Sequence, residues 1–422
     1  MRKCIAIKMT AGGRKGWRLP TIQELASLVD PAVPPPGPTL TAGHPFSNVQ
    51  SCCYWSATTF AHNVGGGTAW VVDFGDAEAS LIDKVKASAA WCTRTLTRVI
   101  MKSATPAATS WILIVLLTVT VTAGFLGFAQ TPAKQAIADA AFVANLYLPD
   151  CQHKCPVVLL VGGSGGGIDW QDYMGEILAR NGVAAIAVAY FAMERLPREL
   201  EQIPLEYFQG VIAYARSHRS LNPDRIGVAG NSKGAELALL LASHDPAIRA
   251  VVAFAPSSVV WQSLPSSVAW DRSADQRPRR SSWTFKGQPL AFVPYAAATS
   301  SESLADMYRR SLNQRDLAQR AAISVERING PILLLSGKQD TTWPSSLMGD
   351  MVVRQLRERA FGFSYEHIAY DDAGHMIAWK RTDIRATRRG GTEQGNRVAQ
   401  DDAERRMLGF FRRHLASTSG RD

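Results

Sequence analysis

Ser232 lies at a place in the sequence where a serine can become a nucleophile. It is the central residue of a G-x-S-x-G motif, Gly-Asn-Ser-Lys-Gly at 230–234. The apolar run before the motif, 225–229, predicts a buried strand, and 235–242 after it predicts a buried helix. A strand, this motif and a helix make a nucleophile elbow, whose glycines permit a sharp turn and leave the serine hydroxyl exposed. The sequence therefore predicts Ser232 as the nucleophile and the Lys233 N–H as an oxyanion donor.

A serine nucleophile needs a base, and the base needs an acid that orients it. Residues 331–336 predict a strand that leads into a loop with Asp340, and 363–370 predict another strand, followed by His375. Both side chains follow the carboxyl ends of strands, where open α/β sheets place their sites. The order Ser, Asp, His is that of α/β-hydrolases. We therefore expect Asp340 as the orienting acid and His375 as the base.

Other roles are open to these two residues. Asp340 could cap a helix that begins near Pro344, and His375 could be a surface loop histidine. Asp371 and Asp372 are rival acids, but they lie too close in sequence to His375 for the usual arrangement.

A second oxyanion donor is expected in the glycine-rich segment 162–167, which follows a predicted strand at 156–161. Glycines there let backbone N–H groups face a tetrahedral intermediate. We expect the donor at Ser164, with Gly163 and Gly165 as alternatives. The segment lacks the G-x-G-x-x-G pattern and the Gly-Lys-Ser/Thr ending of phosphate-binding loops, so nucleotide binding is not expected.

The elements that must position these residues alternate between strands and helices, which predicts a parallel, doubly wound sheet. Residues 257–325 form an excursion too long for a plain connection, and we expect a lid there. Its aromatic residues either offer an apolar face to an acyl chain or simply pack the lid: Trp261, Trp270, Trp283, Phe285, Phe292 and Tyr295. The expected strands are 156–161, 183–189, 225–229, 250–255, 331–336 and 364–370, and the expected helices 170–181, 204–217, 233–243, 344–360 and 400–416.

The C-terminal two thirds resembles the catalytic domain of the acyl-CoA thioester hydrolase / bile acid-CoA:amino acid N-acyltransferase family. The resemblance implies an α/β-hydrolase fold, the Ser232, Asp340 and His375 triad, and an acyl thioester substrate, CoA-linked in the family. The conjugating acyltransferases of this family use a cysteine nucleophile, so the serine favours water as acceptor. An immunoglobulin-like domain usually precedes the catalytic domain, and no stretch here resembles it. The matching stretches are GSGGG at 163–167, VAYF at 188–191, LEYF at 205–208, GNSKGAELAL at 230–239, GKQD at 337–340, GH at 374–375, GG at 390–391 and FFRRHL at 410–415.

The first hundred residues form a separate unit. GWRLPT at 16–21, YWSAT at 54–58, AWVVDF at 69–74 and WCTR at 91–94 resemble the Lcl C-terminal domain family, whose fold is similar to C-type lectins. The resemblance implies a small α+β domain that binds a ligand or a surface. Its tryptophans are expected in the core rather than as sugar platforms: Trp17, Trp55, Trp70 and Trp91.

No charged residue occurs between Lys102 and Lys134, and the apolar segment 111–129 is about long enough to span a bilayer, which takes roughly 20 residues. The basic flank at 94–102 favours a cytoplasmic N-terminal side. We expect one transmembrane helix and an extracytoplasmic hydrolase. Alternatively, the segment is a signal peptide starting at Met101 and cleaved near Ala129. Outside the cytoplasm, a small-loop disulfide between the cysteines at 151 and 155 is plausible.

Composition and charge agree with three parts: 1–100, 101–134 and 135–422. The chain has 422 residues and a net charge of +10, with arginines concentrated at 272–280 and 380–389. These segments either meet an anionic substrate such as CoA or form a solvated lid surface. No metal-ligand set, cofactor motif or nucleic-acid motif is present.

The sequence favours a serine hydrolase that cleaves acyl thioesters through an acyl-enzyme intermediate. A carboxylesterase or a dienelactone-hydrolase-like enzyme is the alternative among enzymes. From another class, the alternative is a surface ligand-binding protein with a vestigial hydrolase domain. The complete predicted triad argues against the vestigial hydrolase.

Overall fold

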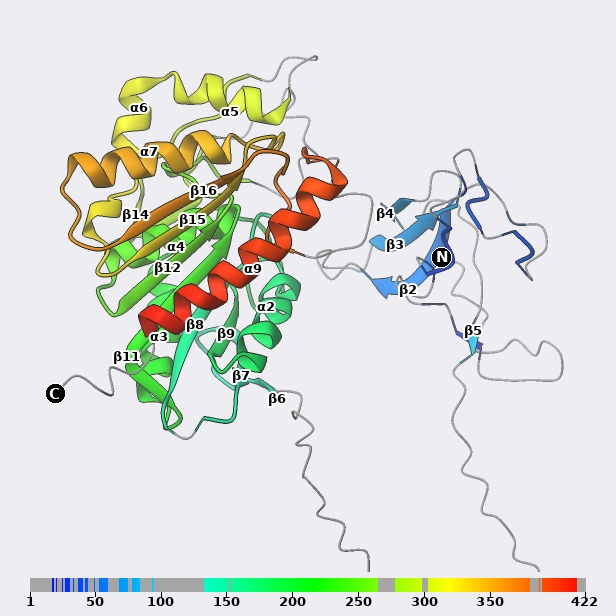
Figure 1. Cartoon of the computed structure of the whole chain (residues 1–422), viewed down its shortest axis with the longest axis horizontal. Coiled ribbons are helices and arrows are strands. Elements are labelled where there is room, and N and C mark those ends of the chain that lie inside the picture. Colours follow the sequence, from blue (N-terminus) through cyan, green and yellow to red (C-terminus); the bar gives the residue numbers. More distant parts are fainter. Residues whose placement is uncertain are drawn as a thin grey trace, which may run out of the picture. The chain divides into compact units, whose positions relative to one another are not determined.

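The computed structural model divides the chain into two compact units, Met1–Gln130 and Thr131–Asp422. Figure 1 shows the strands and helices of both units. The described residues are 17–18, 20, 25, 27–30, 33, 37–40, 42–44, 49, 53–59, 68–74, 78–83 and 93–94 of the first unit, and 133–151, 153–264, 278–297, 303–379, 387 and 389–415 of the second.

The N-terminal unit contains a three-stranded antiparallel sheet of β2 (Cys53–Thr59), β3 (Thr68–Asp73) and β4 (Glu78–Asp83). A second pair, β1 (Trp17–Arg18) with β5 (Thr93–Arg94), joins the two ends of the unit. The side chains of the four tryptophans expected in its core lie outside the described residues. Its described core consists of Leu25, Leu40, Tyr54, Val72 and Phe74.

The C-terminal unit is built on an eight-stranded sheet in the order β16-β15-β12-β11-β8-β9-β7-β6. The six strands from β16 to β9 are parallel, and β7 pairs antiparallel with both β9 and β6. The chain passes from β8 to β9 on one side and to β11 on the other, which creates a switch point beside β8. The strands are β6 (Ala133–Ala136), β7 (Val143–Leu148), β8 (Cys155–Val161), β9 (Ala184–Ala189), β11 (Leu221–Asn231), β12 (Ile248–Phe254), β15 (Ile332–Gly337) and β16 (Tyr365–Tyr370).

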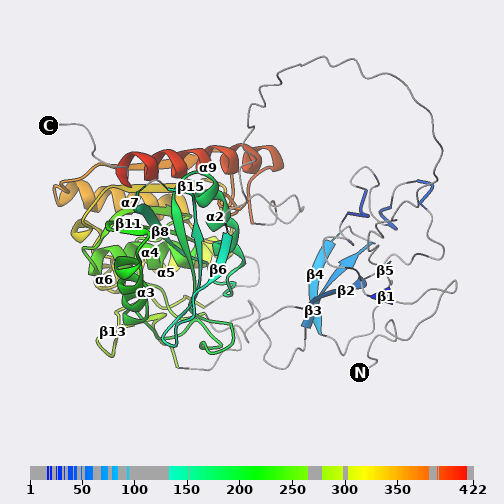
Figure 2. The ribbon, with the colours of Figure 1, turned by 90° about the horizontal axis from the view of Figure 1, so that it is seen from below.

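Helices cover both faces of this sheet, as its continuous apolar strands require. One core cluster joins alternate strand residues to α2 (Asp169–Arg180) and α9 (Glu393–Leu415). The other joins the remaining strand residues to α3 (Glu206–Ser217), α4 (Lys233–His244) and α7 (Ser345–Glu358). Figure 1 and Figure 2 show α9, in red, lying lengthwise along its face of the sheet. The arrangement is α/β-hydrolase-like, as expected.

A long excursion separates β12 from β15, where the lid was expected. It contains β13 (Trp283–Phe285), which pairs with β10 (Ile203–Pro204) and β14 (Gln288–Pro289). Three short helices follow: α5 (Leu304–Leu312), α6 (Arg315–Arg320) and the 3-10 turn Val325–Arg327. Among the expected lid aromatics, Trp261, Trp283 and Tyr295 are buried, so these three pack the excursion rather than present an open apolar face. Trp270 lies outside the described residues.

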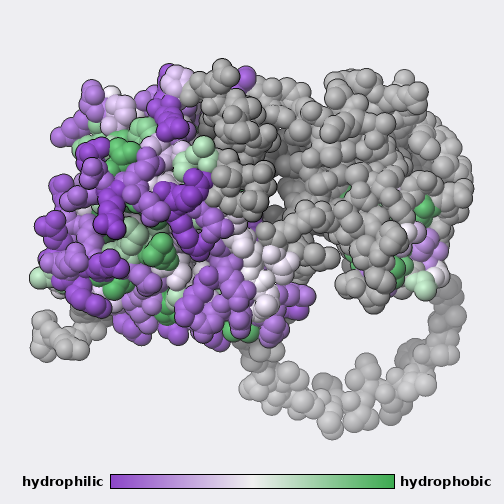
Figure 3. All heavy atoms as spheres, turned by 90° about the horizontal axis from the view of Figure 1, so that it is seen from above, coloured by the Kyte–Doolittle hydropathy of each residue, from purple (hydrophilic) through white to green (hydrophobic). Residues whose placement is uncertain are grey.

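The surface of the C-terminal unit seen in Figure 3 is mostly hydrophilic, with small scattered apolar spots. Among the described residues, the exposed large hydrophobic side chains are Leu347, Phe363 and Val398. No helix within the described ranges is long and apolar enough to cross a membrane. The segment expected to do so, 111–129, falls outside those ranges.

Candidate active site

Ser232 lies in the sharp turn between β11 and α4. Its backbone has φ 57° and ψ −121°, a strained conformation for a residue with a side chain. Three backbone hydrogen bonds hold the turn: Ser232 N–H donates to Phe254 O at 2.9 Å, and Ala235 and Glu236 N–H donate to Ser232 O at 2.8 and 3.1 Å. The sharp turn expected between the strand and the helix is therefore present, and surrounding contacts balance its strain.

The two glycines of the motif are required by space. A Cβ atom on Gly230 would lie 2.0 Å from Gly234 O, and one on Gly234 would lie 2.1 Å from Val161 O. Helix α4 can therefore approach β8 and β11 only because these positions lack side chains.

The structure brings together the three residues expected to form a triad. His375 Nε2 lies 3.0 Å from Ser232 Oγ, and His375 Nδ1 lies 2.8 Å from Asp340 Oδ2. Ser232 follows β11, Asp340 follows β15 and His375 follows β16, so all three lie beyond the carboxyl ends of parallel strands. This line of contacts allows His375 to accept the Ser232 proton while Asp340 holds the Nδ1–H.

The rival acids make other contacts. Asp371 forms an ion pair with Lys338 at 2.5 Å, and Asp372 accepts a hydrogen bond from Gln339 at 3.3 Å. Of the three aspartates considered as partners of His375, it is therefore Asp340 that the structure places against its ring.

The Asp340 carboxylate is buried, and both its oxygens accept further hydrogen bonds. Oδ1 accepts from the N–H groups of Thr342 and Trp343 at 2.9 and 3.2 Å, and Oδ2 accepts from Ser345 Oγ at 2.7 Å. These donors fix the orientation of the carboxylate beside His375. Asp340 thus also shapes the turn before α7, but the N-cap of α7 is Pro344 with no side-chain cap, so the alternative capping role is not observed.

The His375 loop is held by residues that the sequence did not single out. Gly374 N–H donates to Asn396 Oδ1 at 2.8 Å, and His375 N–H donates to Arg389 O at 3.0 Å. A Cβ on Gly374 would lie 2.1 Å from Gly390 O. The side-chain amide of Asn396, in the first turn of α9, therefore positions the His375 loop, and no sequence signal marked it, because the expected helix began only at 400.

The glycine-rich loop after β8 passes beside Ser232. A Cβ on Gly163 would lie 3.2 Å from Ser232 Cβ. Tyr190 Oη–H donates to Gly162 O and Gln171 Nε2–H donates to Gly167 O, so both ends of the loop are fixed. Burial raises the pKa of Tyr190 and keeps its hydroxyl a donor. The expected donors Ser164 and Lys233 belong to this loop and to the first turn of α4, where N–H groups have no acceptor within the helix.

A chain of aromatic rings connects the excursion to the base. The Trp343 ring packs edge-on against His375, with centroids 6.0 Å apart, and Tyr308 packs against Trp343 at 5.8 Å. Tyr308 of α5 in turn meets Trp261 at 4.7 Å. Trp343, in the loop after β15, thus contacts the imidazole and is itself backed by Tyr308 of the excursion.

A second Ser–His–Asp set lies elsewhere in the sheet. Ser336 Oγ is 2.8 Å from His367 Nε2, and His367 Nδ1 is 2.9 Å from Asp350 Oδ1. Ser336 is fully buried within β15 and has no elbow around it. Burial lowers the pKa of His367, opposed by Asp350. The contacts within this second set match those of the first set, but Ser336 is too deeply buried for a substrate to reach it. Substitutions in the second set can therefore serve as matched controls for substitutions in the first.

Cys151 and Cys155 form a disulfide at the start of β8, as considered in the sequence. In the first arginine-rich segment, 272–280, Arg280 forms an ion pair with Glu201 at 3.2 Å. In the second segment, 380–389, residues 380–386 and residue 388 lie outside the described residues. Within the described part of the chain, no group of His, Cys, Asp and Glu side chains could hold a metal ion.

Comparisons with known proteins follow the division into two units. The model of the family "BAAT / Acyl-CoA thioester hydrolase C terminal" matches residues 203–417, and the Lcl C-terminal domain matches residues 2–94. The mitochondrial acyl-coenzyme A thioesterase 2 of Mus musculus is 28% identical over 287 residues, 65% of this chain and 59% of that protein. The acyl-coenzyme A amino acid N-acyltransferase 1 of Mus musculus is 25% identical over 302 residues, 68% and 67% of the two chains.

The chain thus spans about three fifths of the length of the first of these relatives. Among solved structures, a putative dienelactone hydrolase from Klebsiella pneumoniae matches with a TM-score of 0.41 and 18% identity, over 66% of this chain and 97% of that one. An acylaminoacyl peptidase from Pyrococcus horikoshii matches with a TM-score of 0.44 and 14% identity, over 70% and 44%.

Proposed function

This chain belongs to the BAAT / acyl-CoA thioester hydrolase C-terminal family, and from that premise we propose that its C-terminal unit is a serine hydrolase of acyl thioesters. The observation that carries the proposal is the line from Ser232 Oγ to His375 Nε2 at 3.0 Å and from His375 Nδ1 to Asp340 at 2.8 Å. The names of the relatives support an acyl-CoA or similar thioester as substrate.

In the proposed reaction, His375 Nε2 takes the proton of Ser232 while Oγ attacks the thioester carbonyl carbon. The carbonyl oxygen becomes an oxyanion that accepts from the Lys233 N–H and from a donor of the 163–165 segment, with Ser164 preferred. When the C–S bond breaks, the imidazolium returns its proton to the departing thiolate. An acyl-Ser232 ester and a free thiol result.

The second half repeats these roles with water. His375 takes a proton from water, the hydroxide attacks the acyl carbonyl, and the same donors stabilise the second oxyanion. Collapse releases the carboxylic acid, and His375 returns the proton to Ser232 Oγ. Asp340 keeps its negative charge and stabilises the imidazolium in both halves.

We expect the purified full chain to hydrolyse thioesters in preference to oxygen esters. The test compares a series of acyl-CoAs with oxygen esters that carry the same acyl chains, so that only the leaving group differs. Free thiol and free acid are measured, and glycine or taurine is added in a parallel series to detect N-acyl products.

Each alternative has its own result in this assay. An equal or higher kcat/KM for the oxygen esters would instead establish a carboxylesterase or dienelactone-hydrolase-like activity. N-acyl products would establish acyl transfer. No turnover of any ester, with no labelling by a fluorophosphonate, would favour a surface ligand-binding protein.

We also propose that segment 111–129 anchors the chain in a membrane with the hydrolase on the extracytoplasmic side. The charge-free apolar run and its basic flank support this topology. The Cys151–Cys155 pairing supports it as well, because disulfides persist in oxidising compartments. Acyl-CoA is scarce outside the cytoplasm, so topology and natural substrate are linked.

Protease added to intact cells or spheroplasts should degrade the C-terminal unit and spare the N-terminal unit. Alkylation of thiols before and after reduction should show Cys151 and Cys155 oxidised. Lysed cells provide the control, since both units should then be cut. A protected C-terminal unit with both thiols free would refute the topology and favour an intracellular acyl-CoA, whereas a free, shortened C-terminal unit would indicate cleavage near Ala129.

A further inference from the structure

The first turn of α4 contains a buried ion pair that the proposed mechanism does not use. Lys233 Nζ lies 2.8 and 2.7 Å from the two carboxylate oxygens of Glu236, and the side chains are 1% and 0% exposed. The free-energy cost of removing two charges from water often exceeds the gain from their attraction, so a buried ion pair is weak evidence for a stabilising role. Its position directly after Ser232 favours another role.

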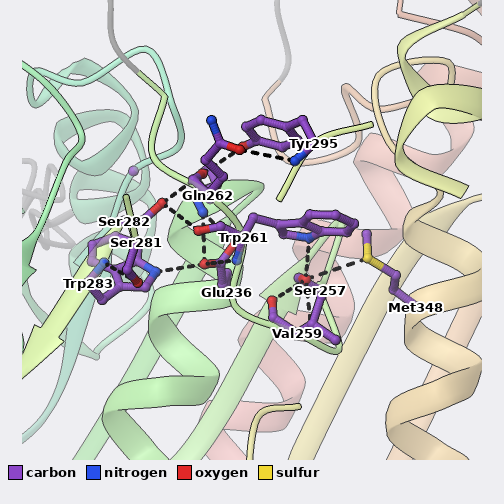
Figure 4. A network of polar contacts seen from close by, with 12 residues as sticks. Glu236, Ser257, Val259, Trp261, Gln262, Ser281, Ser282, Trp283, Tyr295 and Met348 are labelled. Atoms are coloured by element: carbon purple, nitrogen blue, oxygen red, sulfur yellow. Dashed lines mark hydrogen bonds and ion pairs between the residues drawn. The ribbon is translucent and has the colours of Figure 1, made fainter. Parts of the chain in front are cut away.

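One oxygen of this carboxylate is shared by three donors from separate segments. Besides Lys233 Nζ, Glu236 Oε1 accepts from Trp283 Nε1–H at 2.7 Å and from Trp261 N–H at 3.2 Å. Figure 4 shows Glu236 between the two tryptophans, with its dashed contacts to both. The helix that carries the nucleophile is thus joined through a single side chain to β13 and to the start of the excursion.

The donors compensate the buried charge. Burial raises the pKa of the Glu236 carboxyl, and Lys233, with the hydrogen bonds from Trp283 and Trp261, opposes that shift. The Trp283 ring also lies under the ammonium group, with Lys233 Nζ 5.5 Å from the ring centroid. The Lys233 ammonium group is therefore held between the Glu236 carboxylate and the Trp283 ring.

The backbone and side-chain contacts of Glu236 together reach both halves of the site. Glu236 N–H donates to Ser232 O at 3.1 Å, within the strained elbow. Lys233, whose backbone N–H is the proposed oxyanion donor, is fixed by its own side chain. On the other side, Trp261 continues through Tyr308 and Trp343 to the ring of His375.

We propose that Glu236 is a positioning residue, which joins the excursion to the nucleophile elbow and fixes the Lys233 N–H toward the oxyanion. The inference rests on the proposed function of the same site. It assigns Glu236 no contact with substrate. Its effect is on transition-state stabilisation rather than on ground-state binding, because the oxyanion forms only during reaction.

The test is Glu236→Gln in the full chain. The amide has nearly the same shape but leaves Lys233 Nζ without its counter-charge. We expect kcat for the best thioester to fall about 10- to 100-fold with KM within about twofold, since a small misplacement of a reacting group can cost about 100-fold. The rate constant for fluorophosphonate labelling of Ser232 should fall in parallel, because that reaction also needs the oxyanion donors.

Ser243→Ala is the matched control. Ser243 is a buried polar residue in the last turn of the same helix and donates to Leu240 O at 2.8 Å. Its loss should lower the thermal midpoint and leave kcat and the labelling rate unchanged. All rates are measured at a temperature where circular dichroism shows each variant folded.

Two outcomes overturn the inference: a folded Glu236→Gln variant with wild-type kcat and labelling rate, or equal losses in kcat in both variants. If Glu236→Gln does not fold, Trp283→Phe decides, because it keeps an aromatic ring and removes the Nε1–H donor, while the smaller ring lowers the thermal midpoint. It should lower kcat about 3- to 10-fold with KM unchanged, and an unchanged kcat would refute the inference. A wild-type chain that neither labels nor hydrolyses thioesters would instead refute the proposed function.

Discussion

Ser232→Ala should lower kcat for thioester hydrolysis by about 10⁴- to 10⁶-fold, the scale of losses when a triad nucleophile is removed. The methyl group cannot form the acyl-enzyme, so the residual rate comes from substrate binding and the oxyanion donors. The fold should persist, because the elbow is held by backbone contacts and by Gly230 and Gly234 rather than by the hydroxyl. Turnover and fluorophosphonate labelling, with circular dichroism for folding, measure the result.

Ser336→Ala is the matched control, since Ser336 makes the same contact to a histidine but is fully buried in β15. It should keep labelling and turnover near wild type and lower the thermal midpoint modestly, because His367 loses a buried partner. Full labelling of Ser232→Ala would show that another residue reacts with the probe and would reject the elbow assignment.

The sheet was largely predictable because its parallel strands are buried on both faces and therefore appear as short continuous apolar runs. The runs at 156–161 and 331–336 match β8 and β15 to within one residue. β6 (Ala133–Ala136) was missed, because its sequence Ala-Lys-Gln-Ala has no strand propensity and the strand exists through pairing with β7. The predicted start of the last helix, near 400, was wrong, since α9 begins at Glu393. The first turns of α9 lack an apolar pattern that would predict a helix, and they are held in place by the contact between Asn396 and Gly374.

The triad was predictable for a different reason. Each of its members follows a strand, and parallel strands bring their carboxyl ends to one edge. The supporting residues could not be found this way, since their contacts link remote segments. Gln171 meets Val188, and Asn396 meets Gly374. Glu236 did carry a signal, because a carboxylate inside an otherwise apolar helix must find buried partners.

His375→Ala should lower kcat about as much as the loss of Ser232, because nucleophile and base act as a unit. Asp340→Asn should lower kcat by less, about 10⁴-fold, because the serine and the imidazole remain. The loss arises because the carboxylate no longer fixes the imidazole tautomer or stabilises the imidazolium. In both variants the thioester KM should change little, because neither side chain is proposed to bind the ground state. Turnover at saturating substrate, with KM measured separately, provides the comparison.

His367→Ala and Asp350→Asn are the matched controls, because they remove the same residue types from the second Ser–His–Asp set. Asp350→Asn should have little effect, since that carboxylate is 65% exposed and its ion pair is screened by water. His367→Ala should lower stability more than kcat, because it empties a buried site beside Gly349. Normal activity in Asp340→Asn, with a loss in Asp371→Asn or Asp372→Asn, would reassign the acid. The hydrogen bonds that Asp340 accepts from Thr342, Trp343 and Ser345 argue against such a reassignment, because they hold its carboxylate against His375.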